Sequence, residues 1–380
     1  MTGQPLAVAI IGCGVIGKTH TNAVLTLPRL RLAALIDVDT TRADGLADQT
    51  AEKAGTRPAV YSSLADALDG PDKIDLVVVA TPSGLHVEHA TEALEGGAHV
   101  LIEKPLDVDA RRGTALARLA EKAAALGQVA SVISQHRFDP ASEIVRRAIE
   151  AGDFGRITSA MASVPWWRSQ GYYDSGDWRG TWELDGGGAL MNQGVHTLDL
   201  LLWFLGRPVT VSAEFGLLAH QGIEVEDIVT ATLRFESGAL AVLHATTSAY
   251  PGLAVRLQVH GDRGSAVIEG DKLEYFHAAQ DSGGADMGLQ GGGNQAAQFT
   301  DATTSAGVDA TQFTDGHVRQ YVDLLAAIDE NRPPAVTVDD ALVALATVRA
   351  VYVSATTGGK VTLDDVIAGK YDEVRGQLPD

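Results

Sequence analysis

Gly12-Cys13-Gly14-Val15-Ile16-Gly17 is the stretch that decides the fold of the first part of this 380-residue chain. It follows the apolar run Ala7–Ile11 and opens a segment with helical character. In such a turn the first glycine permits a tight bend, the second lets a pyrophosphate approach the backbone, and the third allows close packing of helix on strand. The N-terminus of the helix then offers N–H groups to phosphate oxygens. The stretch therefore predicts a dinucleotide-binding turn, with contacts from Gly12, Gly14, Val15, Ile16 and Gly17.

Short apolar runs alternate with longer amphipathic segments over residues 6–134. Strands that are apolar throughout are buried on both faces, as parallel strands covered by helices are. The alternation therefore predicts a doubly wound, mostly parallel α/β domain over residues 1–136. The predicted strands are Ala7–Ile11, Leu32–Ile36, Leu76–Ala80, Val100–Ile102 and Val129–Ile133, and the predicted helices include Leu85–Glu95 and Ala110–Leu126.

The pattern changes after about residue 136, and residues 137–380 predict a second domain. Helices are expected at Pro140–Ala151, from about Ala189 to Leu205, and near residues 315–330 and 339–357. Turn-forming residues separate five runs with strand character, which favours an antiparallel sheet. These runs are Val209–Phe215, Ile228–Phe235, Ala239–Ser248, Ala254–Gly261 and Ser265–Glu269. Residues 279–312 have a polar, small-residue composition that cannot pack a core, and we expect a mobile loop or lid there.

A carboxylate follows the second predicted strand. Asp37 comes directly after Leu32–Ile36, 20 residues beyond Gly17. At this position a carboxylate accepts hydrogen bonds from the adenosine ribose hydroxyls and repels a 2′-phosphate, which favours NAD over NADP. Arg42 lies nearby and could accommodate a phosphate, so the discrimination against NADP is the softer part of the prediction. The competing interpretation is a glycine-rich turn with an incidental aspartate.

Two more turns follow predicted strands and should reach the same edge of the sheet, where ligands of such folds bind. In Thr81-Pro82-Ser83-Gly84-Leu85-His86 we expect Thr81, Pro82 and His86 to contact the cofactor, although a lone histidine here is more often a helix-terminus residue. Glu103-Lys104-Pro105 is the second turn, and we expect both Glu103 and Lys104 at the cofactor. Lys104 could donate to the hydroxyl that loses its hydride, with its pKa lowered by burial and by the nicotinamide. The alternative is an ordinary exposed lysine beside a glutamate.

The composition excludes several classes of protein. The chain has 29 basic and 49 acidic residues, a net charge of −20, which disfavours nucleic-acid and membrane-surface binding. Cys13 is the only cysteine, so a disulfide framework and a cysteine-rich zinc module are excluded. His86, His89 and His99 lack a zinc-ligand spacing, and no metal is predicted. The N-terminus does not resemble a signal peptide and no apolar run approaches the roughly 18 residues of a membrane span, so we expect a soluble, cytoplasmic protein.

Asn192, His196 and Asp199 stand at i, i+4 and i+7, which places them on one face of a predicted helix whose other positions are largely apolar. A histidine titrates near neutrality and can pass a proton to or from a hydroxyl while a hydride moves. From the residues alone, a buried histidine capped by Asp199 is the competing interpretation.

The motifs G-C-G-V-I-G-K-T-H, T-P-S-G-L-H and E-K-P, in this order and spacing, resemble those of the Gfo/Idh/MocA oxidoreductases, which include glucose–fructose oxidoreductase and inositol dehydrogenase. The resemblance continues through G-G-G-A-L-M-N-Q-G-V-H-T-L-D-L-L-L-W-F-L-G at residues 186–206. It implies a Rossmann domain followed by an α+β domain with a large, mostly antiparallel sheet. In the family the open face of that sheet often forms a homodimer or homotetramer.

The same resemblance implies a set of site residues. It places His196 in the active site with Lys104. The family motif commonly reads D-x-G-x-H, and its aspartate is Asn192 in this chain. An amide can bind a hydroxyl but cannot act as a general base, so the proton role moves to Lys104 or His196. We therefore expect Lys104, Asn192 and His196 to be the catalytic residues and to bind substrate.

The aromatic segment Trp166–Tyr173, with Trp178-Arg179, is the candidate for substrate specificity. Aromatic rings can cover the apolar face of a sugar, and arginine binds hydroxyls, carboxylate or phosphate. The resemblance suggests that Arg168, Tyr172 and Tyr173 line the substrate pocket and that Trp178 and Arg179 lie by the nicotinamide. The alternative is a packed aromatic connection that covers the sheet.

The leading hypothesis is an NAD(H)-dependent oxidoreductase that moves a hydride between nicotinamide and a secondary alcohol or ketone of a sugar, sugar derivative or cyclitol. A second hypothesis keeps the cofactor bound and recycles it, which gives a net-neutral reaction such as epimerisation, glycoside cleavage or coupled oxidation–reduction. A third is a non-catalytic NAD-binding sensor. The presence of both Lys104 and His196 argues against the sensor, because a sensor needs neither proton-handling residue.

Overall fold

The computed structural model describes residues 5–279, 293–299 and 310–378. The chain divides into two compact units. Unit 1 comprises the chain up to Gln135 together with helix α10 (Ala310–Glu330) and the next helix as far as Leu345. Unit 2 comprises residues 136–307 and the C-terminal part from Ala346. Within the described residues, no helix is both long enough and apolar enough to cross a membrane.

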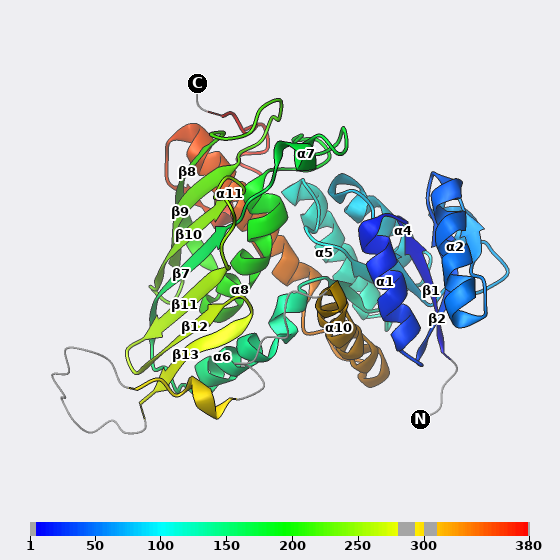
Figure 1. Cartoon of the computed structure of the whole chain (residues 1–380), viewed down its shortest axis with the longest axis horizontal. Coiled ribbons are helices and arrows are strands. Elements are labelled where there is room, and N and C mark those ends of the chain that lie inside the picture. The colour runs from blue at the N-terminus through cyan, green and yellow to red at the C-terminus, as the bar shows by residue number, and fades with distance from the viewer. Residues whose placement is uncertain (1–4, 280–292, 300–309, 379–380) are drawn as a thin grey trace. The chain divides into compact units, whose positions relative to one another are not determined.

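A six-stranded parallel sheet forms the centre of unit 1, with the strand order β3-β2-β1-β4-β5-β6 (Figure 1). Its middle strands are buried along almost their whole length, as their continuous apolar sequences predict. The strands are β1 Leu6–Ile11, β2 Leu30–Ile36, β3 Ala59–Tyr61, β4 Leu76–Val79, β5 His99–Ile102 and β6 Ala130–Val132. The helices between them are α1 Val15–Thr26, α2 Thr40–Ala54, α3 Leu64–Leu68, the short η1 Ser83–Leu85, α4 His86–Glu95 and α5 Ala110–Ala124.

The strand order fixes where a ligand binds. In this doubly wound topology the order reverses between β1 and β4, and ligands occupy the crevice outside the carboxyl ends of the strands at that point. The glycine-rich turn follows β1, the Thr81 turn follows β4, and Glu103-Lys104 follows β5. The predicted fold class of unit 1 is confirmed, and its candidate cofactor residues come from the expected edge of the sheet.

An eight-stranded sheet forms the centre of unit 2, with the order β13-β12-β11-β7-β10-β9-β8-β14. Strands β7 and β10 pair in parallel and the other neighbours are antiparallel, so the predicted mostly antiparallel sheet is confirmed. Helices α6 and α8 pack against one face of this sheet (Figure 1). Along β8, β9 and β10 buried residues alternate with exposed ones, so the opposite face carries exposed side chains.

Where turn residues separate the elements of unit 2, the observed bounds lie close to those expected from the sequence. The strands are β7 Ile157–Pro165, β8 Pro208–Gly216, β9 Ile228–Phe235, β10 Leu240–Thr246, β11 Arg256–Gly261, β12 Gly264–Glu269, β13 Lys272–Ala278 and β14 Val361–Thr362. The helical elements are η2 Gln135–Phe138, α6 Pro140–Ala151, α7 Gln170–Tyr173, the π-helical η3 Leu190–Gly194, α8 Val195–Leu205, η4 Ala296–Gln298, α11 Val338–Thr357 and α12 Leu363–Ile367; η2 starts at the last residue of unit 1, and α11 runs from unit 1 into unit 2.

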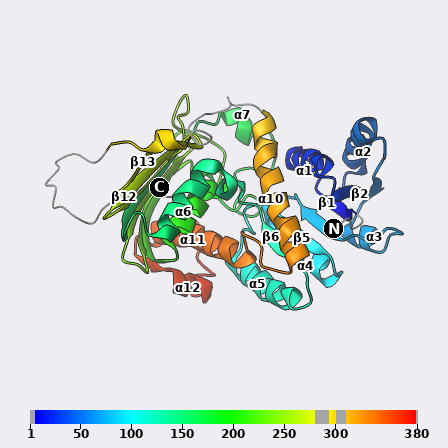
Figure 2. The same ribbon diagram turned by 90° about the horizontal axis from the view of Figure 1, so that it is seen from below.

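The domain assignment differs from the sequence-based one for α10 and the first part of α11. The sequence placed all residues after 136 in the second domain, whereas α10 packs beside α1 in unit 1 (Figures 1 and 2). The reason is hydrophobic: Tyr321 and Leu324 of α10 are fully buried in the same core as Val8 and Ile10 of β1. Most of the predicted loop or lid at residues 279–312 lies outside the described residues.

Candidate active site

The three glycines of the turn after β1 have the surroundings that their predicted roles require. Gly12 adopts a φ of +96°, and a Cβ there would lie 2.4 Å from the carbonyl oxygen of Ala80. A Cβ on Gly17 would lie 1.9 Å from the carbonyl oxygen of Gly12, so only glycine allows α1 to pack this closely on the turn. A Cβ on Gly14 would meet no atom within 4 Å. The open side of Gly14 is therefore where a phosphate can approach the backbone, at the N-terminus of α1.

Asp37 is buried and tied to the same turn. Its Oδ2 accepts a hydrogen bond from the Cys13 backbone N–H at 2.9 Å, and its Oδ1 accepts one from the Asp39 N–H at 2.9 Å. Arg42 lies 3.5 Å from the Asp37 carboxylate and 3.7 Å from that of Asp39. The guanidinium that could have received a 2′-phosphate is therefore flanked by two carboxylates, which repel a phosphate. Burial and the nearby Asp37 raise the pKa of the Cys13 thiol to about 12, so this cysteine is not a nucleophile.

The turn after β4 contributes one unsatisfied polar atom and one structural histidine. The Thr81 hydroxyl oxygen is buried and has no hydrogen-bond partner in the described structure, so it can bind a ligand group. Pro82 is exposed beside it. His86 is buried, with Nδ1 2.6 Å from the Pro105 carbonyl oxygen and Nε2 2.9 Å from that of Thr81. The His86 ring thus links the turn after β4 to the turn after β5. Its predicted contact with the cofactor stays a prediction.

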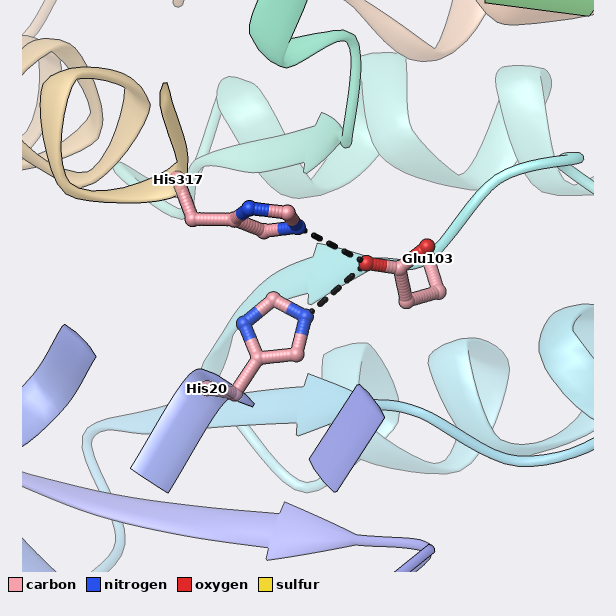
Figure 3. A group of neighbouring side chains, drawn as sticks. All are labelled: His20, Glu103 and His317. Carbon is pink, nitrogen blue, oxygen red and sulfur yellow. Dashed lines mark hydrogen bonds and ion pairs between the residues drawn. The ribbon is translucent and has the colours of Figure 1, made fainter. Parts of the chain in front are cut away.

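Glu103 and Lys104 follow β5, and Figure 3 shows the Glu103 carboxylate between two imidazoles. Glu103 Oε1 lies 3.0 Å from Nε2 of His20 on α1 and 3.4 Å from Nε2 of His317 on α10. Oε2 accepts the backbone N–H of Lys104 at 3.1 Å. Burial raises the pKa of Glu103, but the hydrogen bonds from the two histidines outweigh it and hold this pKa well below its usual value. Both carboxylate oxygens of Glu103 have partners in this cluster, one of them the backbone N–H of Lys104. The predicted contact of Glu103 with the cofactor stays a prediction.

The edge of unit 1 fits a dinucleotide. Gly14 offers an open backbone position at a helix N-terminus, Asp37 stands where a ribose would lie, and the Thr81 hydroxyl lacks a partner. Lys104 is half-buried at the end of the neighbouring strand β5. Val15 is 85% exposed at the start of α1, and Ile16 follows it. The residue types and their placement therefore suit a pyrophosphate, an adenosine ribose and a nicotinamide ring.

In unit 2, Asn192 lies in a π-helical turn that precedes α8. Its Nδ2 donates to Asp185 Oδ1 at 2.9 Å and to the Gly187 carbonyl oxygen at 3.2 Å. The predicted helix from Ala189 to Leu205 therefore begins with a π turn, and the single-face spacing argument applies without change only to His196 and Asp199 within α8. Position 192 carries an amide in this chain, and the carboxylate that lies next to it belongs to Asp185.

Glu226 is a supporting residue that the sequence analysis missed. Its buried carboxylate accepts hydrogen bonds from the backbone N–H groups of Gly188 and Leu190 and from the Tyr352 hydroxyl. A Cβ on Gly188 would lie 1.7 Å from the Glu226 carbonyl oxygen, which explains the glycine at that position. Burial raises the pKa of Glu226 to about 7, although its hydrogen bonds favour the carboxylate. Glu226 thus fixes the start of the segment that carries Asn192.

His196 is half-buried, and its ring meets that of His136 edge-to-face with centroids 5.3 Å apart. His136 Nδ1 lies 2.7 Å from Asp139 Oδ2 and 3.5 Å from Asp271 Oδ1. Burial lowers the pKa of His136, but Asp139 and the other carboxylates outweigh this effect and raise it overall. His136 and Asp139 are a second pair that the sequence analysis missed, because only the fold brings residue 136 to α8. The Asp199 carboxylate accepts two hydrogen bonds from the Arg137 guanidinium, at 2.7 and 2.6 Å.

The aromatic segment brings three of its predicted site residues together. The Arg168 and Arg179 guanidinium carbons lie 5.3 and 4.5 Å from the centroid of the Tyr172 ring. Arg179 also lies 4.5 Å from the Trp178 ring and donates to the Tyr172 hydroxyl at 2.9 Å. Tyr173 is buried instead, with its hydroxyl 2.8 Å from that of Thr247. Burial raises the pKa of the Tyr173 hydroxyl, so this side chain stays protonated.

Two groups of side chains among the described residues have an arrangement that could hold a metal ion: His20, Glu103 and His317, and His136, Asp139 and Asp271. In the first group the hydrogen bonds between the imidazoles and the carboxylate already satisfy Glu103 Oε1. The expectation that the reaction needs no metal stays a prediction.

The fold and the turn after β1 define a class of protein: a nicotinamide-dependent oxidoreductase with a dinucleotide-binding unit and a second, sheet-based unit. Family models agree over both units. The model described as "Oxidoreductase family, NAD-binding Rossmann fold" matches residues 6–131, and the GFO/IDH/MocA C-terminal domain matches residues 142–267. The chain belongs to the GFO/IDH/MocA family, which confirms the resemblance of its motifs.

Named relatives and a solved structure give the family context. The chain is 31% identical to D-glucoside 3-dehydrogenase of Escherichia coli (strain K12) over 65% of its own length and 71% of that protein. It is 27% identical to inositol 2-dehydrogenase of Rhizobium meliloti (strain 1021) over 89% and 93%. The structure of the WlbA dehydrogenase from Bordetella pertussis, in complex with NADH and UDP-GlcNAcA, is similar with a TM-score of 0.80 and 30% identity over 95% of this chain and 99% of that one.

Proposed function

We propose that this protein interconverts a secondary alcohol and a ketone on a sugar, sugar derivative or cyclitol, with NAD preferred to NADP. The observation that carries the proposal is the edge of unit 1, where Gly14, Asp37 and Lys104 follow β1, β2 and β5. Named relatives that act on a glucoside and on inositol support the substrate class. The Asp37 carboxylate, with Arg42 engaged by two carboxylates, supports the preference for NAD.

The proposal gives each candidate residue a role. Bound nicotinamide supplies or accepts the hydride. Lys104, whose backbone N–H is held by Glu103, polarises or deprotonates the reacting hydroxyl. His196 passes the proton on, and the ring of His136, held by Asp139, lies beside it. Asn192, held by Asp185, orients the substrate because an amide can donate to or accept from a hydroxyl but cannot take its proton.

The proposal also includes the assembly and the compartment. We propose a homodimer or homotetramer formed through the exposed face of the eight-stranded sheet, where Met161, Leu240 and Val242 are 50%, 54% and 44% exposed. Val242 pairs with Met161 in register, so these apolar side chains are neighbours on that face. We expect the enzyme to work in the cytoplasm, where its cofactor pool is.

Cofactor titration followed by a substrate screen tests the function. NADH and NADPH are titrated by fluorescence, and turnover is followed at the nicotinamide absorbance over sugars, sugar acids, inositols and nucleotide sugars. We expect tighter binding of NADH and turnover within one of these classes. Lys104→Ala should abolish turnover and keep NADH binding. Failure to bind either nucleotide would overturn the proposal, and tighter binding of NADPH would overturn the assigned preference.

A further inference from the structure

Two arginines of unit 2 share one aromatic ring. Arg168 follows β7 and Arg179 follows α7, and both guanidinium groups lie within cation–π distance of Tyr172. Arg168 lies 5.1 Å from the Trp166 ring as well, and Arg179 lies 4.5 Å from the Trp178 ring. The rings restrict both long side chains, so each guanidinium group is held against the Tyr172 ring before any ligand arrives.

Neither arginine has a carboxylate partner among the described residues, although the chain has an excess of 20 negative charges. Other arginines in this protein do: Arg137 pairs with Asp199, and Arg57 pairs with Asp44 and Asp48. Two adjacent positive charges repel each other, and a local excess of this kind is favourable once an anion lies between or beside them. The absence of a protein carboxylate leaves that position to a ligand.

Two buried polar atoms next to the ring also lack partners in the described structure. They are Nε of Arg168 and Oε1 of Gln193. Gln193 Nε2 lies 3.3 Å from the Tyr172 hydroxyl, so this side chain borders the same group. An unsatisfied buried N–H on a guanidinium costs free energy until an acceptor arrives. An anionic ligand would supply the acceptor for Arg168, while a ligand hydroxyl would satisfy Gln193.

The hollow on the other side of Arg179 does not suit an anion. It is lined by Arg179, Tyr173 and the acidic residues Asp174, Asp177 and Glu224. Three acidic side chains and one arginine among its lining residues make that hollow net negative. We therefore look for the anion position at the Tyr172 ring, which both guanidinium groups contact.

We propose that Arg168 and Arg179, held on the ring of Tyr172, form a subsite for a carboxylate or phosphate group of the substrate. This inference rests on the proposed function and narrows its substrate class to sugars that carry an anionic group. The planar guanidinium fork matches both anions and can bind either with two parallel hydrogen bonds. The resemblance to the family suggested that Arg179 lies by the nicotinamide. In the proposed subsite Arg179 binds the anionic group of the substrate instead.

Matched substrates test the subsite in the wild-type enzyme. The NADH- or NAD-loaded protein is assayed with D-glucose, D-glucuronic acid, D-glucose 1-phosphate, UDP-glucose and UDP-glucuronic acid. We expect kcat/KM for at least one anionic member to exceed that for D-glucose by roughly 100-fold, through a lower KM. A preference for D-glucuronic acid identifies the carboxylate as the group bound, and a preference for the phosphate esters identifies the phosphate. Equal kcat/KM for neutral and anionic members would overturn the subsite.

Charge-removing variants then assign the preference to the two arginines. Arg168→Gln and Arg179→Gln should each raise KM for the preferred anionic substrate roughly 10- to 100-fold, in line with the loss of a charged hydrogen bond. NADH affinity and kcat are measured on the same variants, so that a rise confined to KM for the anionic substrate is distinguished from a general loss of activity. Arg168→Lys keeps the positive charge but loses the planar guanidinium. Its KM for the anionic substrate should lie between the values for the wild type and for Arg168→Gln. Arg147→Gln removes an exposed arginine of α6 and is the matched control.

The outcomes separate the subsite from the proposed function. Loss of NADH binding in the wild type would overturn the proposed function itself. NADH binding with equal kcat/KM for neutral and anionic sugars would leave the proposed function standing and overturn the subsite. If a Gln variant is unfolded by circular dichroism, Arg168→Lys and the wild-type preference decide the question. A preference for anions that survives both Gln variants would also overturn the assignment to these arginines.

Discussion

A methyl group added at Gly14 and one added at Gly17 would meet opposite surroundings in the same turn. At Gly14, where φ is −73°, the methyl carbon would touch nothing within 4 Å, so Gly14→Ala should fold with unchanged stability. We expect it to weaken NADH binding at least about tenfold, equivalent to 1.4 kcal/mol, because the methyl stands where the pyrophosphate should approach. At Gly17 it would clash with the Gly12 carbonyl, and Gly17→Ala should cost about 1–3 kcal/mol of stability.

Urea unfolding and NADH fluorescence, measured on both variants, check this separation. Gly45→Ala is a suitable control, because a Cβ there also meets no atom within 4 Å and the residue lies within α2, away from the turn. Wild-type NADH affinity in Gly14→Ala would contradict the assigned position of the phosphates. An equal loss of stability in the two variants would contradict the packing argument.

At this scale the sequence predicted positions whose role is local. The glycines and Asp37 could be read from spacing, because a turn and the strand ends beside it lie within a few residues of one another. His86 and Glu103 could not, because their partners are decided by the fold. His86 contacts the carbonyl of Pro105, and Glu103 contacts His317, more than 200 residues along the chain. Residue type alone does not distinguish a buried structural histidine from one that meets a ligand.

At the scale of elements, the Glu103 cluster joins α1, the end of β5 and α10. Glu103→Gln keeps the shape of the side chain but offers one acceptor oxygen in place of two. We expect a loss of about 1–3 kcal/mol in the free energy of unfolding, because buried N–H groups of His20, His317 and Lys104 lose an acceptor. Urea denaturation at pH 8 measures it.

Asp329→Asn is the matched control for this variant. The exposed Asp329 on α10 pairs with Arg29, which lies just beyond the end of α1, so the control removes a carboxylate from the same pair of elements. An exposed ion pair contributes only about 0–1 kcal/mol. A larger loss in Asp329→Asn than in Glu103→Gln would show that the buried cluster does not hold these elements together.

The same cluster predicts how stability depends on pH. Burial lowers the pKa of His20 from its ordinary 6.5 and outweighs the opposing pull of Glu103. The folded protein therefore binds fewer protons at His20 than the unfolded chain, and stability should fall as pH drops below about 6.5. His20→Gln keeps a donor for Glu103 but cannot be protonated. It should reduce the decline between pH 8 and 5.5 by up to about 1.4 kcal/mol in total, because only one pH unit of this interval lies below 6.5. Superimposable wild-type and variant stability profiles in urea unfolding would contradict this.

Helices and strands were predicted where the hydrophobic pattern and the flanking turn residues indicated the same element. The longer buried parallel strands and the unit 2 strands β8 to β12 were found from the sequence, whereas β13 and the two-residue β14 were not predicted. β3 has three residues, too few for a periodicity, and was missed. β7, Ile157–Pro165, lies in the middle of its sheet but carries Ser, Thr and Ala at most positions, so its hydrophobic pattern is weak. The π turn before α8 depends on the Glu226 carboxylate, which is remote in sequence and leaves no mark in the helix itself.

At the scale of the whole molecule, we propose that two copies of the chain associate through the exposed face of the eight-stranded sheet. Met161 and Val242 face each other across the parallel pair of β7 and β10 and are 50% and 44% exposed. Burial of such apolar side chains between two copies is favourable, whereas a buried unpaired lysine is costly. The double variant Met161→Lys, Val242→Lys should therefore shift the protein from dimer or tetramer towards monomer in light scattering. NADH binding should persist, because the candidate nucleotide-binding residues belong to unit 1.

Leu126→Lys, at an 81% exposed position after α5, is the control and should leave the assembly unchanged. A monomeric wild type, or a double variant that keeps the wild-type mass, would contradict assembly through this face.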